Sequence, residues 1–167
     1  HMYVMSKTYE LHQSLIDGSY RTQKGEQFEI FDPKHRVVTS TKYRDRIPQA
    51  SFVVNFMYKE IIPNLISNNF ACIKGKGVDT ARKAFKGILR KADMKDYCLC
   101  ADLKGYFDSI SHKALLNEMT QYISDEWVFK YYKDVIDSND QEIGIGLGSE
   151  INQLSAVSFL NKLDHLI

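Results

Sequence analysis

The sequence predicts an α+β fold, and three features of its 167 residues support that prediction. Residues 26–41 alternate polar and apolar side chains around an Asp-Pro-Lys-His turn, which is typical of a β-hairpin. Several longer stretches space their apolar residues as amphipathic helices do. The apolar run 97–101 is too short for a helix and predicts a buried strand. With 44% hydrophobic residues, the chain can bury the core of one domain, or of one domain and part of another.

The first expected element is a short amphipathic helix at 9–16. The hairpin comes next, and its second strand is rich in the β-branched residues that favour strands. Residues 49–66 have helical apolar spacing, interrupted by Pro63, which removes a backbone donor and so kinks or ends a helix. Another helix is expected at 80–91, with Asp79 as its N-cap.

Two helices are expected after the buried strand, at 111–123 and 124–136, each with the serine at its start as the N-cap. The three glycines in 141–148 predict a strand or a loop. A last amphipathic helix is expected at 150–167. Because the sequence stops inside this helix, we expect a truncated domain.

Charge is distributed unevenly, although the formal net charge is only +1. Residues 34–95 hold 14 Lys and Arg against 4 Asp and Glu, whereas residues 96–167 hold 5 against 12. A basic block of this density is typical of a protein that contacts the phosphates of a nucleic acid. The acidic block is compatible with a bound metal, although most of its acids are also typical of a solvated helix face.

Several classes of protein are excluded by simple features. No apolar run reaches the ~18–20 residues that a membrane-spanning helix needs, so no membrane partner is expected. The cysteines, Cys72, Cys98 and Cys100, are odd in number and include no Cys-x-x-Cys pair. They argue against a disulfide framework and a structural zinc site, and they favour a cytoplasmic location. The sequence makes no prediction of the oligomeric state.

A first candidate site follows the buried strand, in the run Asp102-Leu103-Lys104-Gly105-Tyr106-Phe107-Asp108. A carboxylate at the end of a strand can hold Mg²⁺, which prefers one or two protein carboxylates together with substrate phosphates. Gly105 would let backbone N–H groups approach a phosphate closely. The alternative is a strand-to-helix turn in which Asp102 only accepts hydrogen bonds.

Two more candidates are a glycine-rich segment and the basic block. Residues 144–148 read Gly-Ile-Gly-Leu-Gly, which lets the backbone pass close to a flat or anionic ligand; the alternative is a flexible loop with Ser149 as a helix cap. Single surface cations usually only solubilise a protein, but together these form the footprint of a phosphate contact. They are Lys34, Arg36, Arg44, Arg46, Lys74 and Lys76, followed by Arg82, Lys83, Lys86, Arg90 and Lys91 on the expected helix.

In this order, the candidates resemble the fingers and part of the palm of a bacterial-type reverse transcriptase, the family of group II intron proteins and retrons. The resemblance covers about residues 28–167. Residues 102–110 are similar, almost letter for letter, to the first catalytic motif of the family, Asp-x-Lys-Gly-x-Phe-Asp-x-Ile. Four other segments resemble family motifs in the same order: the fingers hairpin at 28–38, the Asp-Arg-Ile-x-Gln segment at 45–49, a glycine-basic motif at 69–77, and a glycine-containing loop with its helix at 144–164.

The resemblance implies an RNA-directed DNA polymerase with two Mg²⁺ ions, an RNA template, a DNA or RNA primer, and deoxynucleoside triphosphates. It implies that Asp102 is the catalytic carboxylate that binds both metals, and that the carbonyl of Leu103 is also a ligand. Nucleotide-binding roles are implied for Lys34, Arg36, Gly105, Tyr106, Phe107, Leu147 and Gly148, with Phe107 excluding a ribose 2′-hydroxyl. Nucleic-acid-binding roles are implied for Arg44, Arg46, Lys74, Lys76, Asn152 and Gln153.

The same resemblance divides the chain into an N-terminal helical segment at 1–20, fingers at 21–95 and a partial palm with an incomplete sheet at 96–167. The Tyr-x-Asp-Asp motif of the family is absent, and no two aspartates are adjacent anywhere in the sequence. We therefore expect the two-metal site to be incomplete and the 167 residues alone to be inactive. Leu147 replaces a glutamine of many relatives, so its template contact is expected to differ. The alternatives are an RNA-binding, maturase-like protein and a phage-defence relative with little templated synthesis.

Overall fold

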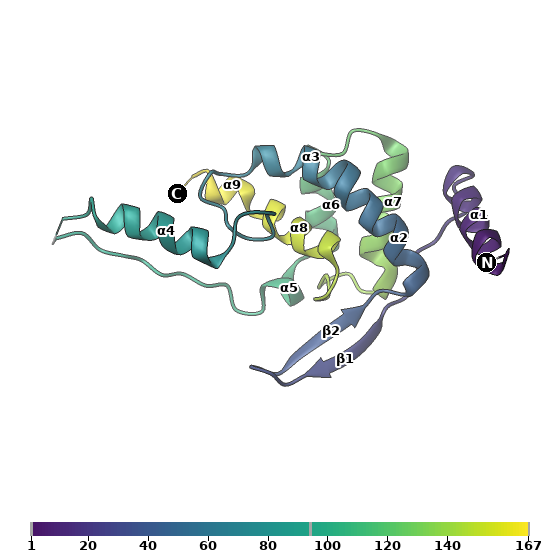
Figure 1. Ribbon diagram of the computed structural model, residues 1–167, viewed down its shortest axis with the longest axis horizontal. Helices are drawn as coiled ribbons and strands as arrows, with labels where there is room; N and C mark the ends of the chain where they lie inside the picture. Colours follow the sequence, from purple (N-terminus) through teal and green to yellow (C-terminus); the bar gives the residue numbers. More distant parts are fainter. Residues whose placement is uncertain (1, 94, 167) are drawn as a thin grey trace.

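The computed structural model describes residues 2–93 and 95–166 of the chain. Its helices are, in chain order, α1 Met2–Ile16, α2 Tyr43–Phe52, η1 Val53–Met57, α3 Tyr58–Glu60, η2 Ile62–Asn64, α4 Val78–Leu89, α5 Tyr106–Ser109, α6 His112–Met119, α7 Glu126–Ile136, η3 Asp137–Asn139, α8 Glu150–Phe159 and α9 Asn161–Asp164. The strands are β1 Glu26–Ile30 and β2 Arg36–Ser40. A body that includes α2, α6, α7 and α8 carries the hairpin on one side, with α1 at one end and α4 extending at the other (Figure 1). This mixture of helices with one small antiparallel sheet is compatible with the α+β class.

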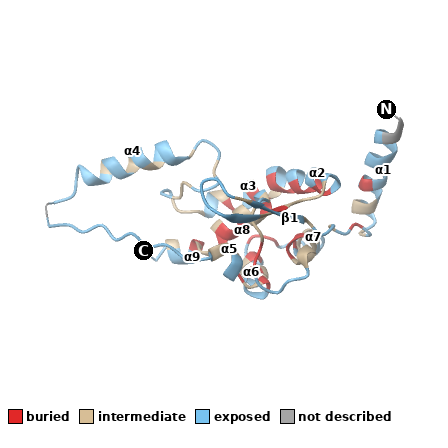
Figure 2. Ribbon diagram, turned by 90° about the horizontal axis from the view of Figure 1, so that it is seen from below, coloured by how far each residue is buried: buried red, intermediate tan, exposed pale blue. Residues whose placement is uncertain are grey.

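The core lies between α6, α7, α8 and the helical run that continues α2. Leu115 and Met119 lie one turn apart on α6, so both point to the same side, and both are fully buried. They meet α8, whose Ile151 and Leu154 are fully buried as well. Tyr132 of α7 is also fully buried, and its hydroxyl avoids the cost of an unmade hydrogen bond by donating to Ser155 Oγ at 2.8 Å. Figure 2 shows that buried positions are concentrated in the central helices.

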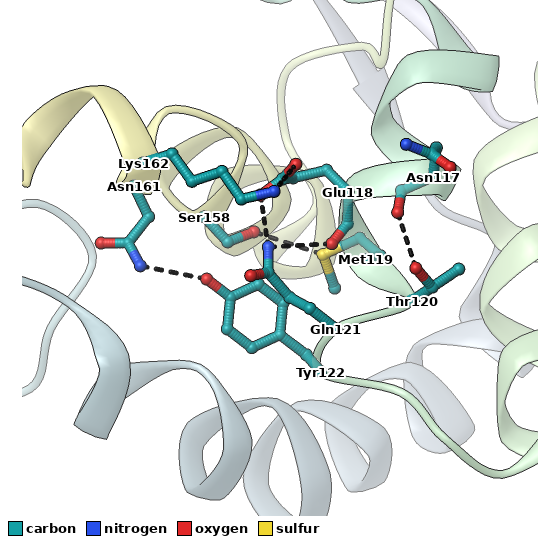
Figure 3. A network of polar contacts seen from close by, with 9 residues as sticks. All are labelled: Asn117, Glu118, Met119, Thr120, Gln121, Tyr122, Ser158, Asn161 and Lys162. Atoms are coloured by element: carbon teal, nitrogen blue, oxygen red, sulfur yellow. Dashed lines mark hydrogen bonds and ion pairs between the residues drawn. The ribbon is translucent and has the colours of Figure 1, made fainter.

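Polar contacts join the C-terminal helices to α6, as Figure 3 shows. Lys162 forms an ion pair with Glu118 at 2.8 Å. The amide of Asn161, which is buried, donates to the Tyr122 hydroxyl at 3.1 Å and to the backbone carbonyl of Asn64 at 2.9 Å. Asn161 therefore links α9 both to the turn after α6 and to η2.

The predicted hairpin at 26–41 is confirmed. Phe28 pairs with Val38 in an antiparallel register that runs from Glu26 opposite Ser40 to Ile30 opposite Arg36. The alternating pattern predicted these strands because successive side chains of a strand point to opposite faces.

Most of the expected helices form, but several of their ends differ. α1 begins by Met2 instead of residue 9. The expected 49–66 helix is part of a longer helical run that begins at Tyr43 and ends in η2, which contains Pro63. The helix after Ser111 forms and ends earlier than expected, at Met119. The expected last helix is interrupted at Leu160, between α8 and α9.

Two of the predicted N-caps are wrong. Gly77, rather than Asp79, occupies the N-cap position of α4, and Asp79 lies in its first turn. Asp125, rather than Ser124, caps α7, because its carboxylate accepts a hydrogen bond from the Val128 N–H at 2.9 Å. A carboxylate at this position satisfies a free donor and also faces the positive end of the helix dipole.

The predicted strand at 97–101 is wrong, and so is the palm sheet built on it. Within residues 2–93 and 95–166 the only sheet is the two-stranded hairpin. Tyr97 is 100% exposed and Leu99 is 91% exposed, in a segment that extends between α4 and α5 (Figure 2). An apolar run predicts a side-chain pattern, but a strand also needs a neighbour for its N–H and C=O groups, and the described residues supply none here.

Residues 141–149, called the glycine loop below, form the loop that was one of the two expectations for this segment. It has no regular strand and makes two isolated bridges, one from Ile143 to Ser111 and one from Leu147 to Val38. The glycine loop thus lies between the hairpin and the start of α6.

Candidate nucleic-acid and nucleotide interface

The glycine loop contacts the hairpin through its backbone. The Thr39 N–H donates to the Leu147 carbonyl at 2.7 Å, which places the loop parallel to β2. A Cβ on Gly148, whose φ is +122°, would lie 2.6 Å from the Thr39 carbonyl oxygen. A Cβ on Gly146 would lie 2.9 Å from Thr39 Oγ1. The glycines permit a close backbone approach, and in this structure the neighbour that they approach is β2; the expected approach to a flat or anionic ligand stays a prediction.

The other side of the glycine loop is attached to the segment that holds the first candidate motif. The Ile145 N–H donates to the Phe107 carbonyl at 3.0 Å, and the Gly144 N–H donates to the Ile110 carbonyl at 2.8 Å. The hairpin, the glycine loop and α5 therefore adjoin one another, although they are far apart in the sequence.

Asn152 of α8 supports the glycine loop from behind. Its side-chain amide donates to the carbonyl of Gly146 at 3.1 Å and also to that of Ile145. Gln153 points elsewhere and contacts the Cys72 sulfur at 3.6 Å, which connects α8 to the segment before α4. Direct contact of these two side chains with a nucleic acid stays a prediction.

A groove of about 410 Å³ lies where the hairpin, α2 and the glycine loop meet. Arg46 lies on its wall and is held by hydrogen bonds from Nε to the Thr41 carbonyl at 2.9 Å and from its guanidinium to Ser40 Oγ at 3.0 Å. Gln49 and Gly148 line the same groove. Two predicted binding residues, Arg46 and Gly148, are thus brought to one concave surface.

The residues of the first candidate motif, 102–108, do not come together in one site. Asp102 and Leu103 lie exposed in an irregular segment before α5. Gly105 follows with a φ of +61°, the left-handed conformation that favours glycine, and occupies the N-cap position of α5. No group of three or more His, Cys, Asp or Glu side chains in residues 2–93 and 95–166 is arranged to hold a metal ion. The side chains around Asp102 therefore do not fit a complete two-metal site.

Tyr106 and Phe107 are half-buried and pack edge to face, with ring centroids 5.9 Å apart. The Tyr106 hydroxyl donates to the Ala156 carbonyl of α8 at 2.6 Å. Burial is the main reason that the pKa of Tyr106 is raised to about 12, and the charge of Asp164 adds to it. This hydroxyl stays protonated and keeps α5 attached to α8 at neutral pH.

The predicted cations do not form one cluster. Lys34 and Arg36 are exposed at the turn end of the hairpin. Arg44 lies over the ring of Tyr20, 5.2 Å from its centroid, and Lys76 donates to the Ser67 carbonyl at 2.8 Å. Lys74 is exposed in the turn before α4, and the cations of α4 lie on the extended arm.

Asp45 has a structural role that the sequence analysis missed. Its carboxylate is fully buried and accepts hydrogen bonds from the Tyr20 hydroxyl at 2.7 Å and from the Gln23 N–H at 3.0 Å. Burial, with the bond to Asp45 second, raises the pKa of Tyr20 well above its ordinary value. The Asp-Arg-Ile-x-Gln segment therefore anchors the chain before the hairpin and also supplies Arg46 to the groove.

His112, also missed, lies at the start of α6 and is only 4% exposed. Its Nδ1 is 2.9 Å from an oxygen of Asp137, and its Nε2 is 2.8 Å from the Gly144 carbonyl oxygen. Lys133 binds the other oxygen of Asp137. Burial raises the pKa of Asp137, but the bonds from Lys133 and His112 outweigh it and leave this pKa below its usual value.

No protein-family model matches this chain, and no curated protein matches it either. No helix of residues 2–93 and 95–166 has both the length and the apolar character that crossing a membrane requires.

Proposed function

We propose that this chain is the fingers and part of the palm of an RNA-directed DNA polymerase of the bacterial reverse-transcriptase type. One observation carries the proposal: segments that resemble family motifs at three distant places in the sequence adjoin one another. The Thr39–Leu147 and Ile145–Phe107 backbone hydrogen bonds join β2, the glycine loop and α5. Unrelated short likenesses would give no reason for these contacts.

The groove beside Arg46 suits a nucleic-acid strand. Its guanidinium is fixed by two hydrogen bonds to the protein, so little side-chain entropy is lost when its remaining donors bind a phosphate. Gly148 also lines this wall, and the space that a side chain there would take is filled by Thr39 of β2. In this proposal, the template lies in the groove, with its phosphates toward Arg46.

Lys34 and Arg36 suit the triphosphate of the incoming nucleotide. Both are exposed, and neither forms an ion pair with another side chain in the part of the chain that the structure describes. Arg offers a fork of donors and Lys a point charge, and both bind phosphate well. Asp102 would supply one carboxylate to Mg²⁺. Because the described residues do not complete a metal site, we assign them binding and no chemical step.

Replacing Arg46 with alanine is expected to weaken the binding of a short RNA template annealed to a DNA primer by about tenfold, since one charge-assisted phosphate contact is lost. Fluorescence anisotropy at two or more salt concentrations measures both the affinity and its salt dependence, which should become shallower in R46A. Lys113→Ala removes an exposed cation from α6, away from the groove, and should leave binding unchanged. Equal weakening by both variants would contradict the placement of the template.

The Arg36→Ala variant tests the polymerase reading against RNA binding alone. With template–primer bound, we expect R36A to weaken deoxynucleoside triphosphate binding by about tenfold, because a bidentate phosphate contact is lost. Its affinity for the template–primer itself should stay within about twofold. Template–primer binding with no measurable triphosphate binding in the unmodified chain would favour the RNA-binding alternative. Primer extension by these 167 residues would contradict the expectation that they are inactive alone.

A further inference from the structure

His112 lies between two groups that can only accept hydrogen bonds. Asp137 contributes a carboxylate oxygen 2.9 Å from Nδ1, and Gly144 contributes a carbonyl oxygen 2.8 Å from Nε2. A neutral imidazole has one N–H donor and one lone pair, whereas the imidazolium has two donors. Both contacts are hydrogen bonds only if the buried ring carries a proton on each nitrogen.

We propose that His112, protonated on both nitrogens, is a positioning residue that holds the glycine loop against β2 and makes the loop loosen as the pH rises. The clamp itself stands on the geometry of the chain. Its effect on nucleic-acid binding rests on the proposed function, because only that proposal makes the glycine loop part of the template surface.

The hydrogen bond lost on deprotonation is the one to Gly144. Asp137 is an ion, so it retains the remaining proton of the ring on Nδ1 through a charge-assisted bond. Nε2 then presents a lone pair to the Gly144 carbonyl oxygen, and a hydrogen bond becomes a repulsion between two acceptors. Gly144 keeps its N–H bond to the Ile110 carbonyl, and the Ile145 N–H of the peptide group that follows keeps its bond to the Phe107 carbonyl.

Loss of the hydrogen bond at Gly144 weakens the attachment of the loop to α5 and to the hairpin. The next residue, Ile145, donates to Phe107, and two residues later Leu147 accepts from Thr39. The first of these bonds holds the loop on α5, and the second holds it on β2. His112 holds the carbonyl of Gly144, next to the first of these bonds, and Asn152 holds the carbonyls of Ile145 and Gly146 between the two.

The charged residues on the elements around His112 favour the protonated ring, and they therefore support a loop that loosens as the pH rises. From the end of α7, Asp137 faces the ring and Lys133 binds the second oxygen of Asp137. The backbone carbonyl of Glu142 in the glycine loop accepts from the His112 backbone N–H at 2.9 Å, and Asp108 of α5 lies with its backbone against Gly144. Asp137 is thus the only one of these charges bonded to the ring within the described residues, and it favours the cation.

The first test uses the unmodified chain and needs no ligand. NMR of the histidine ring nitrogens gives the protonation state of His112 from about pH 5.5 to about pH 8.5, the range in which histidines titrate. Amide exchange, expressed as protection factors, reports the loop in the same samples. We expect protection at Ile145 and Thr39 to fall about tenfold or more as His112 loses its proton, and protection at Phe129 of α7 to stay constant. Constant protection at Ile145 and Thr39 across the titration would overturn the clamp.

Asp137→Asn supplies the second test, because Asp137 is partly exposed and its amide replacement is nearly isosteric. Without the carboxylate, the doubly protonated ring loses its anionic partner, so the loop should loosen at a lower pH than in the unmodified chain. The control His12→Gln, on the exposed side of α1, should not move the profile. An identical profile in D137N and the unmodified chain would refute the role of the ion pair.

Template–primer binding, followed over the same pH range, separates the two proposals. Binding that weakens together with the amide protection supports both. A loop that loosens while binding stays constant supports the clamp and removes the glycine loop from the template surface.

Discussion

The variant Gly148→Ala is expected to lose the docking of the glycine loop on the hairpin, at a cost of about 2–4 kcal/mol. Gly148 has a φ of +122°, which strains any residue with a side chain, and the added Cβ would lie 2.6 Å from the Thr39 carbonyl oxygen. That oxygen belongs to the paired backbone of β2 and cannot rotate away as a side chain would. Either the strand or the loop must shift, and the Thr39–Leu147 hydrogen bond lengthens or breaks.

Urea unfolding measures this loss, and amide exchange at Thr39 locates it. Gly87→Ala is a matched control, since Gly87 lies inside α4 and a Cβ there meets nothing within 4 Å. Alanine is favoured over glycine inside a helix by up to about 1 kcal/mol, so G87A should be neutral or stabilising. The two substitutions are identical in chemistry, yet G148A should destabilise the chain and G87A should not. A stability of G148A equal to that of the unmodified chain would show that the loop and β2 are not in contact in solution.

The same variant bears on the proposed function. If the groove beside Arg46 holds the template, displacing its Gly148 wall should weaken template–primer binding as well as stability. A second outcome is that G148A is less stable and yet binds template–primer fully at a temperature where it is folded. That result would give the loop a structural role only and would exclude it from the interface.

Local signals in the sequence predicted the local structure. The hairpin formed where side chains alternate about an Asp-Pro turn, and the interior helices formed where apolar residues recur at helical spacing. The N-cap of α7 was displaced by one residue because two adjacent residues can both cap, and only the geometry selects Asp125 over Ser124. Such signals act over a few residues, so a single sequence is enough to read them.

The remaining features depend on contacts between distant segments. Residues 97–101 have the composition of a buried strand, yet strand formation depends on a neighbour that this run cannot specify. The three glycines predicted a close approach to a ligand, and nothing in them indicated that β2 would be a neighbour. His112 was missed because its two acceptors, Asp137 and Gly144, lie 25 and 32 residues away, and a lone histidine carries no pattern of its own.

Asp45→Ala is the substitution in α2 from which we expect the largest loss of stability, about 3 kcal/mol. The Asp45 carboxylate is fully buried and accepts from the Tyr20 hydroxyl and the Gln23 N–H, at 2.7 and 3.0 Å. Alanine leaves both donors without an acceptor, and the Tyr20 hydroxyl is buried, so the cost includes its desolvation as well as the lost bonds. It also frees the segment between α1 and β1, which Asp45 ties to α2.

Asp45→Asn separates the hydrogen bonds from the volume of the side chain. Its amide oxygen can accept from Gln23, and its amide nitrogen can donate to the Tyr20 hydroxyl, which also accepts, so D45N should lose only about 1 kcal/mol. Combining Asp45→Ala with Tyr20→Phe in a double-mutant cycle should give a coupling of about 1.5–3 kcal/mol, the range of a hydrogen bond to a charged group. Urea unfolding of the four proteins provides the measurement. Additive losses would mean that the hydroxyl and the carboxylate do not interact.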